Sequence, residues 1–191
     1  MNDVSKEIWP ACYILNEYLK SIKLKSKIVL ELGCGVGLPS KLLASQGNKV
    51  FSQDRVDNIS CSKHEEIVFI RHDWHTMEPK SLLEKLPKNL DYIFGSDLFY
   101  EEEGYSRLMF LVSHLLSELK AVSFISVVHQ RNIYDSIAED LLTLNLQSEL
   151  IFHSEPFILF EIRANTSDLL EVHYEDGFLP SESAVEMRSR A

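Results

Sequence analysis

The amino-acid sequence predicts a doubly wound, Rossmann-like α/β fold, in which helices cover both faces of a mostly parallel, seven-stranded sheet. Two observations lead to this prediction. Short apolar runs of strand length alternate with helical segments along the chain, and a cluster of alternate glycines follows the first run. The runs are apolar on both faces, as strands in the middle of a parallel sheet are, and the helices between them would form right-handed crossovers.

Five apolar runs account for the parallel part of the sheet, at residues 27–32, 49–54, 67–70, 91–97 and 121–128. Apolar residues at helical spacing predict the helices between them, at residues 38–46, 105–120 and 133–146. Two last runs, 149–153 and 157–163, are separated by a hairpin-length gap, so the sheet should end with an antiparallel last strand. An amphipathic segment at 8–19 predicts an N-terminal helix that packs over the cofactor side of the sheet.

The bulk composition predicts one globular domain. The chain has 191 residues, of which 45% are hydrophobic and 25% charged, and we assign residues 1–165 to the domain and 166–191 to a partly mobile, acidic C-terminal extension. No stretch approaches the roughly 18 apolar residues of a membrane span, and the N-terminus lacks the features of a signal peptide. Three cysteines without paired spacing are expected to be reduced thiols. We therefore expect a cytoplasmic or nuclear protein.

The net charge of -10 indicates which classes of molecule the protein could bind. An acidic chain disfavours a nucleic-acid backbone, because phosphate contacts need a concentrated basic face. It suits a basic protein substrate better, although an acidic balance also keeps a protein soluble without any partner. We expect no nucleic-acid or membrane partner and favour a monomer, while the oligomeric state stays open.

The glycine cluster lies within residues 29–39, where an apolar strand runs into Gly33, Gly35 and Gly37. Glycines are needed where the backbone takes a positive φ or lies against a ligand. Their G-x-G-x-G spacing differs from the dinucleotide pattern G-x-G-x-x-G. Glu31, two residues before the first glycine, would repel a pyrophosphate but suits a ligand with an amine and a sulfonium, as in S-adenosylmethionine. The loop therefore indicates methyl transfer.

Three further residues would complete the cofactor site. Asp54 ends the second strand and can accept both ribose hydroxyls, although strands also end in Asp as a turn former. Asp73 can accept the exocyclic amine of adenine while Trp74 covers the ring, the alternative being a tryptophan that fills a gap under a loop. His72 and His75 flank this pair, but without a second cluster of ligands no metal site is predicted.

The substrate side is predicted after the fourth strand, in Gly95-Ser96-Asp97-Leu98-Phe99-Tyr100. Asp97 can orient an incoming amine, and the rings of Phe99 and Tyr100 can hold a cationic nitrogen. The alternative is an aspartate that caps the next helix beside two core aromatics. Arg131, at the tip of the next strand, either contacts the loop after Asp97 or starts the following helix.

These residues resemble a known family. Residues 30–39, Asp54 and the tetrad 97–100 are similar to the seven-β-strand methyltransferases of family sixteen, a branch known chiefly for protein lysine methylation. The resemblance implies S-adenosylmethionine as the cofactor, a methyltransferase fold and a protein substrate. It also implies these roles: Glu31, Gly33 and Gly35 at the methionyl part, Asp54 at the ribose, Asp73 and Trp74 at the adenine, Trp9 closing the pocket, and Asp97 and Tyr100 at the substrate. The segment 55–66 is shorter than is usual in that family, so a more open adenine side is expected.

For methyl transfer the protein needs only to align the acceptor nitrogen with the methyl group and the sulfur of the cofactor, and to remove a proton from that nitrogen. A lysine must lose its proton before attack, whereas a guanidinium loses it during the reaction and needs a close carboxylate, for which Asp97 or Glu101 could serve. The first hypothesis is a methyltransferase for a protein lysine or arginine, with histones among the candidate substrates. A small-molecule methyltransferase and a catalytically silent binding module are the alternatives.

Overall fold

The computed structural model describes residues 7–56, 65–119, 121–129 and 133–165. The strands are β1 Ile28–Leu32, β2 Lys49–Asp54, β3 Ile67–Arg71, β4 Tyr92–Ser96, β5 Ser123–His129, β6 Leu146–Ser154 and β7 Phe157–Ala164. The helices are α1 Pro10–Ile22, α2 Leu38–Ser45, α3 Lys80–Leu83, α4 Tyr105–Glu118 and α5 Ile133–Thr143, with a 3-10 turn at Glu102–Gly104 before α4. None of the helices in this part of the chain has the length and apolar character needed to cross a membrane.

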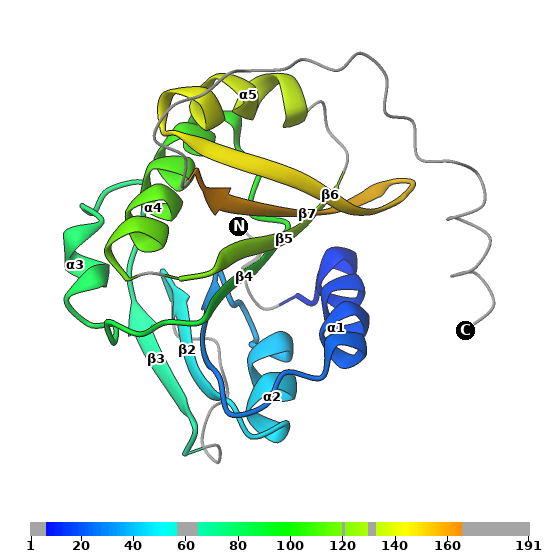
Figure 1. Ribbon diagram of the computed structural model, residues 1–191. Helices are drawn as coiled ribbons and strands as arrows, with labels where there is room; N and C mark the ends of the chain where they lie inside the picture. The colour runs from blue at the N-terminus through cyan, green and yellow to red at the C-terminus, as the bar shows by residue number, and fades with distance from the viewer. Residues whose placement is uncertain (1–6, 57–64, 120, 130–132, 166–191) are drawn as a thin grey trace.

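All seven strands form one sheet, in the order β3-β2-β1-β4-β5-β7-β6 (Figure 1). Strands β1 to β5 pair in parallel, and β7 runs antiparallel to both β5 and β6. The predicted fold class, with its antiparallel last strand, is confirmed. The strand order changes direction between β1 and β4, which is the place where open α/β sheets bind their ligands, beyond the carboxyl ends of the strands.

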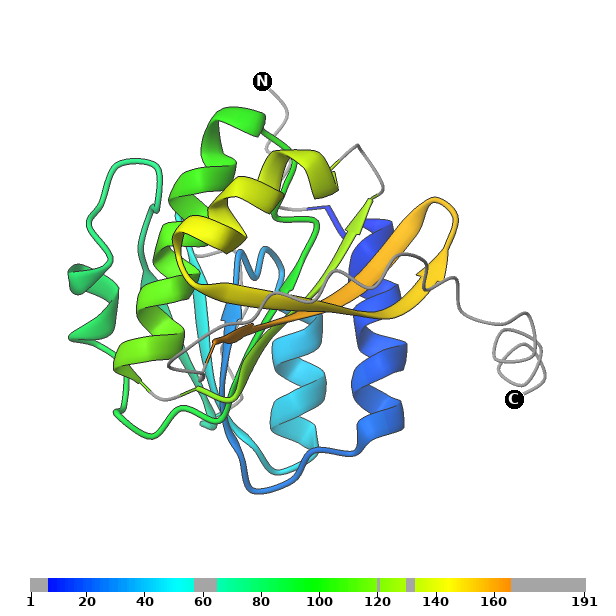
Figure 2. The ribbon, with the colours of Figure 1, turned by 45° about the horizontal axis from the view of Figure 1, so that its top comes forward.

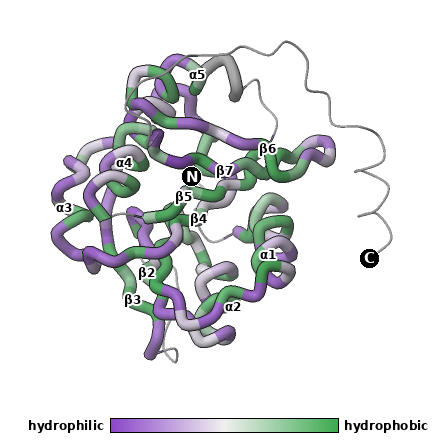
Figure 3. The backbone as a smooth tube through the Cα atoms, in the orientation of Figure 1, coloured by the Kyte–Doolittle hydropathy of each residue, from purple (hydrophilic) through white to green (hydrophobic). Residues whose placement is uncertain are grey.

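Helices cover both faces of the sheet (Figure 2). Leu30 and Leu32 of β1 belong to the core under α3, α4 and α5, whereas Val29 belongs to the core under α1 and α2. This alternation follows from the two-residue period of a strand. Figure 3 shows the apolar residues concentrated along the strands and on the inner sides of the helices. Glu31, one residue after Leu30, therefore belongs to the α1 and α2 side.

The predicted N-terminal helix is confirmed as α1, which begins with Pro10 at its first position, where a missing N–H costs nothing. Its inner residues Ala11, Leu15 and Leu19 are buried against α2 and the sheet. Trp9, at the N-cap, lies at the end of the helix that reaches the carboxyl ends of the strands.

Several boundaries differ from the prediction by one to three residues, and the junction of α5 with β6 is an example. Helix α5 ends at Thr143 rather than at 146, and β6 begins at Leu146 rather than at 149. Asn145 takes a φ of 52°, which turns the chain directly from the helix into the strand. The short helix α3 was not predicted, because four residues carry no periodic pattern. The predicted extension 166–191 and Arg131 lie outside the described residues.

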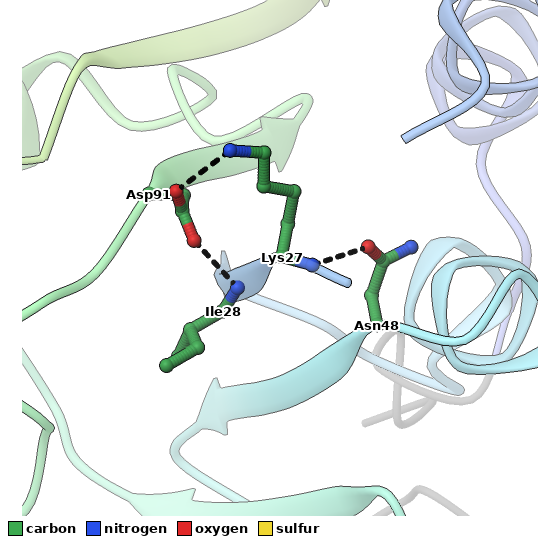
Figure 4. Close-up of polar contacts among 4 residues, drawn as sticks. All are labelled: Lys27, Ile28, Asn48 and Asp91. Carbon is green, nitrogen blue, oxygen red and sulfur yellow. Dashed lines mark hydrogen bonds and ion pairs between the residues drawn. The ribbon is translucent and has the colours of Figure 1, made fainter. Parts of the chain in front are cut away.

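Polar contacts join three strands at the end of the sheet away from the carboxyl ends of β1 and β4 (Figure 4). Asp91 accepts hydrogen bonds from Lys27 Nζ at 3.1 Å and from the Ile28 N–H at 2.8 Å. Asn48 Oδ1 accepts the Lys27 N–H at 3.0 Å. These side chains hold the starts of β1, β2 and β4 in place relative to one another. The polar contacts at this end of the sheet therefore stabilise the fold.

We expect Gly95→Ala to destabilise the fold by about 1 to 3 kcal/mol, because a Cβ there would lie well within 3.0 Å of the Leu98 side chain. Leu98→Ala removes those atoms, so the double variant should lose less stability than the sum of the two single variants. Urea unfolding measures this. Gly47→Ala is the control, since its φ of 85° is strained but nothing lies within 4 Å, and Leu98→Ala should not rescue it. Additive losses for Gly95→Ala and Leu98→Ala would contradict the packing described.

Candidate active site

A cavity of about 490 Å³ opens at the carboxyl ends of β1, β2 and β4, where the strand order changes direction. Its lining comes from segments far apart in the sequence: Glu7, Trp9, Gly33, Gly35, Asp54, Arg55, Trp74, Ser96, Asp97, Leu98, Tyr100 and Glu101. Among the residues to which the resemblance assigned a role, all except Glu31 and Asp73 line the cavity, whereas Phe99 of the predicted substrate side does not. A second cavity, of about 460 Å³, lies between residues 76–79, α4 and α5 and shares only Trp74 with the first.

The glycine loop leaves bare backbone at the floor of the cavity. Gly33, Gly35 and Gly37 all have positive φ angles, of 57°, 50° and 70°. A side chain at Gly33 would collide with Leu98 and would approach Trp74 to 3.4 Å. The loop therefore needs glycine both for its conformation and for its close neighbours, and it brings the backbone of Gly33 and Gly35 to the cavity lining.

Asp54 lies where it was predicted, beside this loop. Its Oδ2 accepts the Gly35 N–H at 2.8 Å, and its Oδ1 accepts the Arg55 N–H at 2.6 Å. Each carboxylate oxygen can accept more than one hydrogen bond, so both stay able to receive a ribose hydroxyl. The ribose contact itself stays a prediction.

Gln53, which the sequence analysis missed, holds the loop from below. Its side chain is fully buried, and its Oε1 accepts the Gly33 N–H at 3.3 Å while its Nε2 donates to the His72 carbonyl at 2.5 Å. The signal was present in the sequence as a polar residue inside an apolar strand, since buried polar groups need hydrogen-bond partners. Gln53 thus ties the end of β1 to the segment that carries Trp74.

Glu31 is buried beneath the glycine loop. Its side chain is 1% exposed and accepts the N–H of Ser40 at 2.9 Å together with the Ser40 hydroxyl, in the first turn of α2. Burial raises the pKa of Glu31 to about 8. It does not line the cavity, and its contact with a ligand amine stays a prediction. Because strand alternation turns Glu31 toward α2, it supports the loop from beneath.

We expect Glu31 to make stability pH-dependent. Its pKa is raised from 4.5 to about 8 in the folded protein, so the stability linked to its protonation is present below pH 4.5 and is lost as the pH rises through 8. Between pH 5 and 9 the unfolding free energy should fall by about 2 to 5 kcal/mol more in the wild type than in Glu31→Gln. Urea unfolding at several pH values measures this, and equal slopes for the two proteins would contradict it.

Asp73 takes part in a local turn, and its contact with adenine stays a prediction. Its Oδ1 accepts the His75 N–H at 3.0 Å, and its carbonyl accepts the N–H groups of Thr76 and Met77 at 3.2 and 2.8 Å. Asp73 therefore closes a turn and is not part of the cavity lining, while Trp74 does line the cavity as predicted. Burial lowers the pKa of the neighbouring His72. No group of three metal-ligating side chains occurs within the described residues.

Asp97 and Tyr100 lie at the cavity, but Phe99 does not. Asp97 has an unusual φ of 53°, and its Oδ1 accepts the His129 N–H at 3.4 Å. Phe99 is fully buried and packs edge-to-face on Tyr105, so it cannot hold a substrate nitrogen. Tyr100 is 41% exposed, and burial of the rest of the ring raises its pKa.

Negative charge predominates in the cavity. Among the described residues that line it, the charged ones are Glu7, Asp54, Arg55, Asp97 and Glu101. Glu7 and Arg55 were not predicted, because only the fold brings them to the strand ends. A lining of this kind suits a cationic ligand or a cationic side chain.

Comparison with known sequences agrees with this geometry. Residues 1–139 match the family described as lysine methyltransferase. The chain belongs to the lysine methyltransferase family. The predicted resemblance to family sixteen is thereby confirmed.

Several curated methyltransferases are similar along most of this chain. The histone-arginine methyltransferase METTL23 of Xenopus laevis is 31% identical over 152 residues, which cover 73% of this chain and 64% of the relative. The protein N-lysine methyltransferase METTL21A of Xenopus tropicalis is 29% identical over 145 residues, covering 69% and 65%. The chain spans 53 to 64% of the length of the METTL23 relatives from frog, mouse and rat.

Known structures of methyltransferases have the same fold as this family member. The TehB-like SAM-dependent methyltransferase from Corynebacterium glutamicum has a TM-score of 0.62 at 13% identity, over 78% of this chain and 86% of that one. The DhpI structure in complex with SAH has a TM-score of 0.58 at 12% identity, over 81% and 86%. At these identities the likeness concerns the fold.

Proposed function

We propose that the protein is an S-adenosylmethionine-dependent methyltransferase that modifies a lysine or arginine nitrogen of a protein substrate. The observation that carries the proposal is one cavity that joins the glycine loop and Asp54 to Asp97 and Tyr100. Family membership supports it, and so do the names of relatives, which include a histone-arginine methyltransferase, a protein N-lysine methyltransferase and an EEF1A lysine methyltransferase.

The residues present fit this cofactor. The backbone at Gly33 and Gly35 would hold the methionyl part, Asp54 the ribose and Trp74 the face of the adenine, while Trp9 would close the cavity from the side of α1. When bound, S-adenosylmethionine supplies an activated methyl group and a neutral thioether leaving group. The carboxylates of the lining would stabilise its positive charge.

The protein's own task is to align the acceptor nitrogen and to remove its proton. Asp97 would orient the nitrogen from the tip of β4, and Tyr100 would cover it with an aromatic face. Carboxylates near a lysine raise its pKa and so hinder the neutral amine that must attack. A guanidinium stays charged until transfer and benefits from them, so the lining of this cavity favours arginine.

A basic protein, such as a histone, is the proposed partner, since the chain carries a net charge of -10 and the cavity is lined with carboxylates. We also propose that the protein acts as a monomer in the cytoplasm or nucleus. The buried thiol of Cys12 is compatible with such a reducing compartment. No role with nucleic acid or membranes is proposed.

The test is to incubate the full chain with methyl-labelled S-adenosylmethionine and a cell extract. Label should appear in protein and, after hydrolysis, in methylated arginine rather than methylated lysine. Asp97→Asn with Tyr100→Phe serves as the inactive control. Label confined to small solutes would instead indicate a small-molecule methyltransferase. Absence of cofactor binding at millimolar concentration would indicate a silent binding module.

A further inference from the structure

An apolar ledge lies beside the cavity, on the outward face at the start of α1. We define it by Ile8, Trp9 and Tyr13, whose side chains are 42%, 42% and 54% exposed. Trp9 is the N-cap of the helix, and Tyr13 follows four residues later, one turn along the same face. The inner side of this turn, at Ala11, Cys12 and Leu15, is buried. The ledge is therefore an exposed apolar surface on a firmly packed helix.

The ledge is continuous with the cavity, because Trp9 belongs to both. Two exposed carboxylates also line the cavity, those of Glu7, next to the ledge in sequence, and Glu101, which follows Tyr100. A ligand that extends from the cavity along α1 would thus pass the carboxylates of Glu7 and Glu101 and then contact the apolar ledge.

We propose that the apolar ledge binds the protein substrate beside its acceptor residue and selects an apolar side chain two positions from that residue. This inference rests on the proposed function. Four helical residues rise about 6 Å, which is close to the span of two residues in an extended chain. Residues two apart in an extended segment also point to the same side. An acceptor in the cavity therefore places its second neighbour over Tyr13.

Charge selects a basic peptide over other occupants. A second copy of this chain would also carry a net charge of -10, and its approach to Glu7 and Glu101 would be repulsive. An anionic membrane surface is disfavoured for the same reason. A peptide whose acceptor is a lysine or arginine brings the opposite charge to the carboxylates and apolar surface to the ledge.

The test compares two fluorescein-labelled peptides, each with one arginine in a glycine-serine host. One has leucine two positions on either side of the arginine, and the other has serine there. Binding to the full chain is measured by anisotropy in the presence of S-adenosylhomocysteine. The leucine peptide should bind about three- to tenfold more tightly. Tyr13→Ser should abolish this preference. Val122→Ser, a change at a 53% exposed residue at the other end of the sheet, should leave it intact.

Three outcomes would overturn the proposed role of the apolar ledge. They are equal dissociation constants for the two peptides, no measurable binding of either peptide, and an unchanged preference in Tyr13→Ser. These outcomes are separable from the proposed function. If label is transferred to protein in the extract but the two peptides bind with equal affinity, the proposed role of the apolar ledge is overturned and the proposed function is not. A preference for the leucine peptide that Tyr13→Ser abolishes, without any methyl transfer, would support the ledge and contradict the proposed function.

Discussion

Asp97→Asn combined with Tyr100→Phe should lower the rate of methyl transfer at least about 100-fold while changing the Kd for S-adenosylmethionine by less than about threefold. Both residues line the cavity, and the proposal assigns them to the substrate rather than to the cofactor. Asparagine tolerates the positive φ at position 97 and keeps an acceptor for the His129 N–H, so the backbone should not change. Single-turnover transfer and calorimetric titration measure the two effects.

The control for this pair is Glu103→Gln, which removes a nearby exposed carboxylate that does not line the cavity. It should leave both the rate and the affinity close to those of the wild type. Wild-type turnover in the double variant would show that the substrate side has been assigned to the wrong residues.

Asp54→Ala should weaken binding of S-adenosylmethionine at least about 100-fold, because a carboxylate hydrogen bond to a ligand hydroxyl contributes about 1.5 to 3 kcal/mol and Asp54 can make two. The change also removes the acceptors of the Gly35 and Arg55 N–H groups, which hold the loop. Isothermal titration of the full chain measures the Kd. An unaltered Kd would place the ribose elsewhere.

Asp73→Asn is the matched comparison, because asparagine can still accept the His75 N–H and close the turn. The structure predicts a change in Kd of less than about threefold, since Asp73 is not part of the lining. A loss comparable to that of Asp54→Ala would instead restore the contact with the adenine amine that the sequence predicted.

The local sequence pattern was sufficient to predict most of the helices and strands. The strand 49–54 was predicted with the bounds that it has, because Gly47 and Asn48 end the helix before it and Asp54 is a turn former. The glycine loop was predicted because three positive φ angles in five residues admit few other residues. Asp97 and Tyr100 were placed at the cavity because their segment follows a strand whose carboxyl end adjoins that loop.

Side-chain direction was harder to predict. Glu31 and Phe99 were expected to face a ligand, yet one turns to α2 and the other to Tyr105. The two-residue period of a strand would have assigned Glu31 to the α2 face. Asp73 follows a local turn preference that competes with ligand binding.

Contacts between distant segments carry no local signal. Leu98 packs over Gly33 and Gly95, and Gln53 reaches both Gly33 and the His72 carbonyl. Arg55 and Glu7 join the cavity only because the sheet brings its strand ends together beside the start of α1. Such residues become visible once the strand order and the register are known.

The central claim is that the cavity at the ends of β1, β2 and β4 binds S-adenosylmethionine, and intrinsic fluorescence tests it most directly. The chain has two tryptophans, Trp9 and Trp74, and both line this cavity. Titration of the full chain with S-adenosylmethionine should change the emission saturably, and Trp9→Phe and Trp74→Phe should each retain part of that change. No change in emission up to millimolar cofactor would contradict the account.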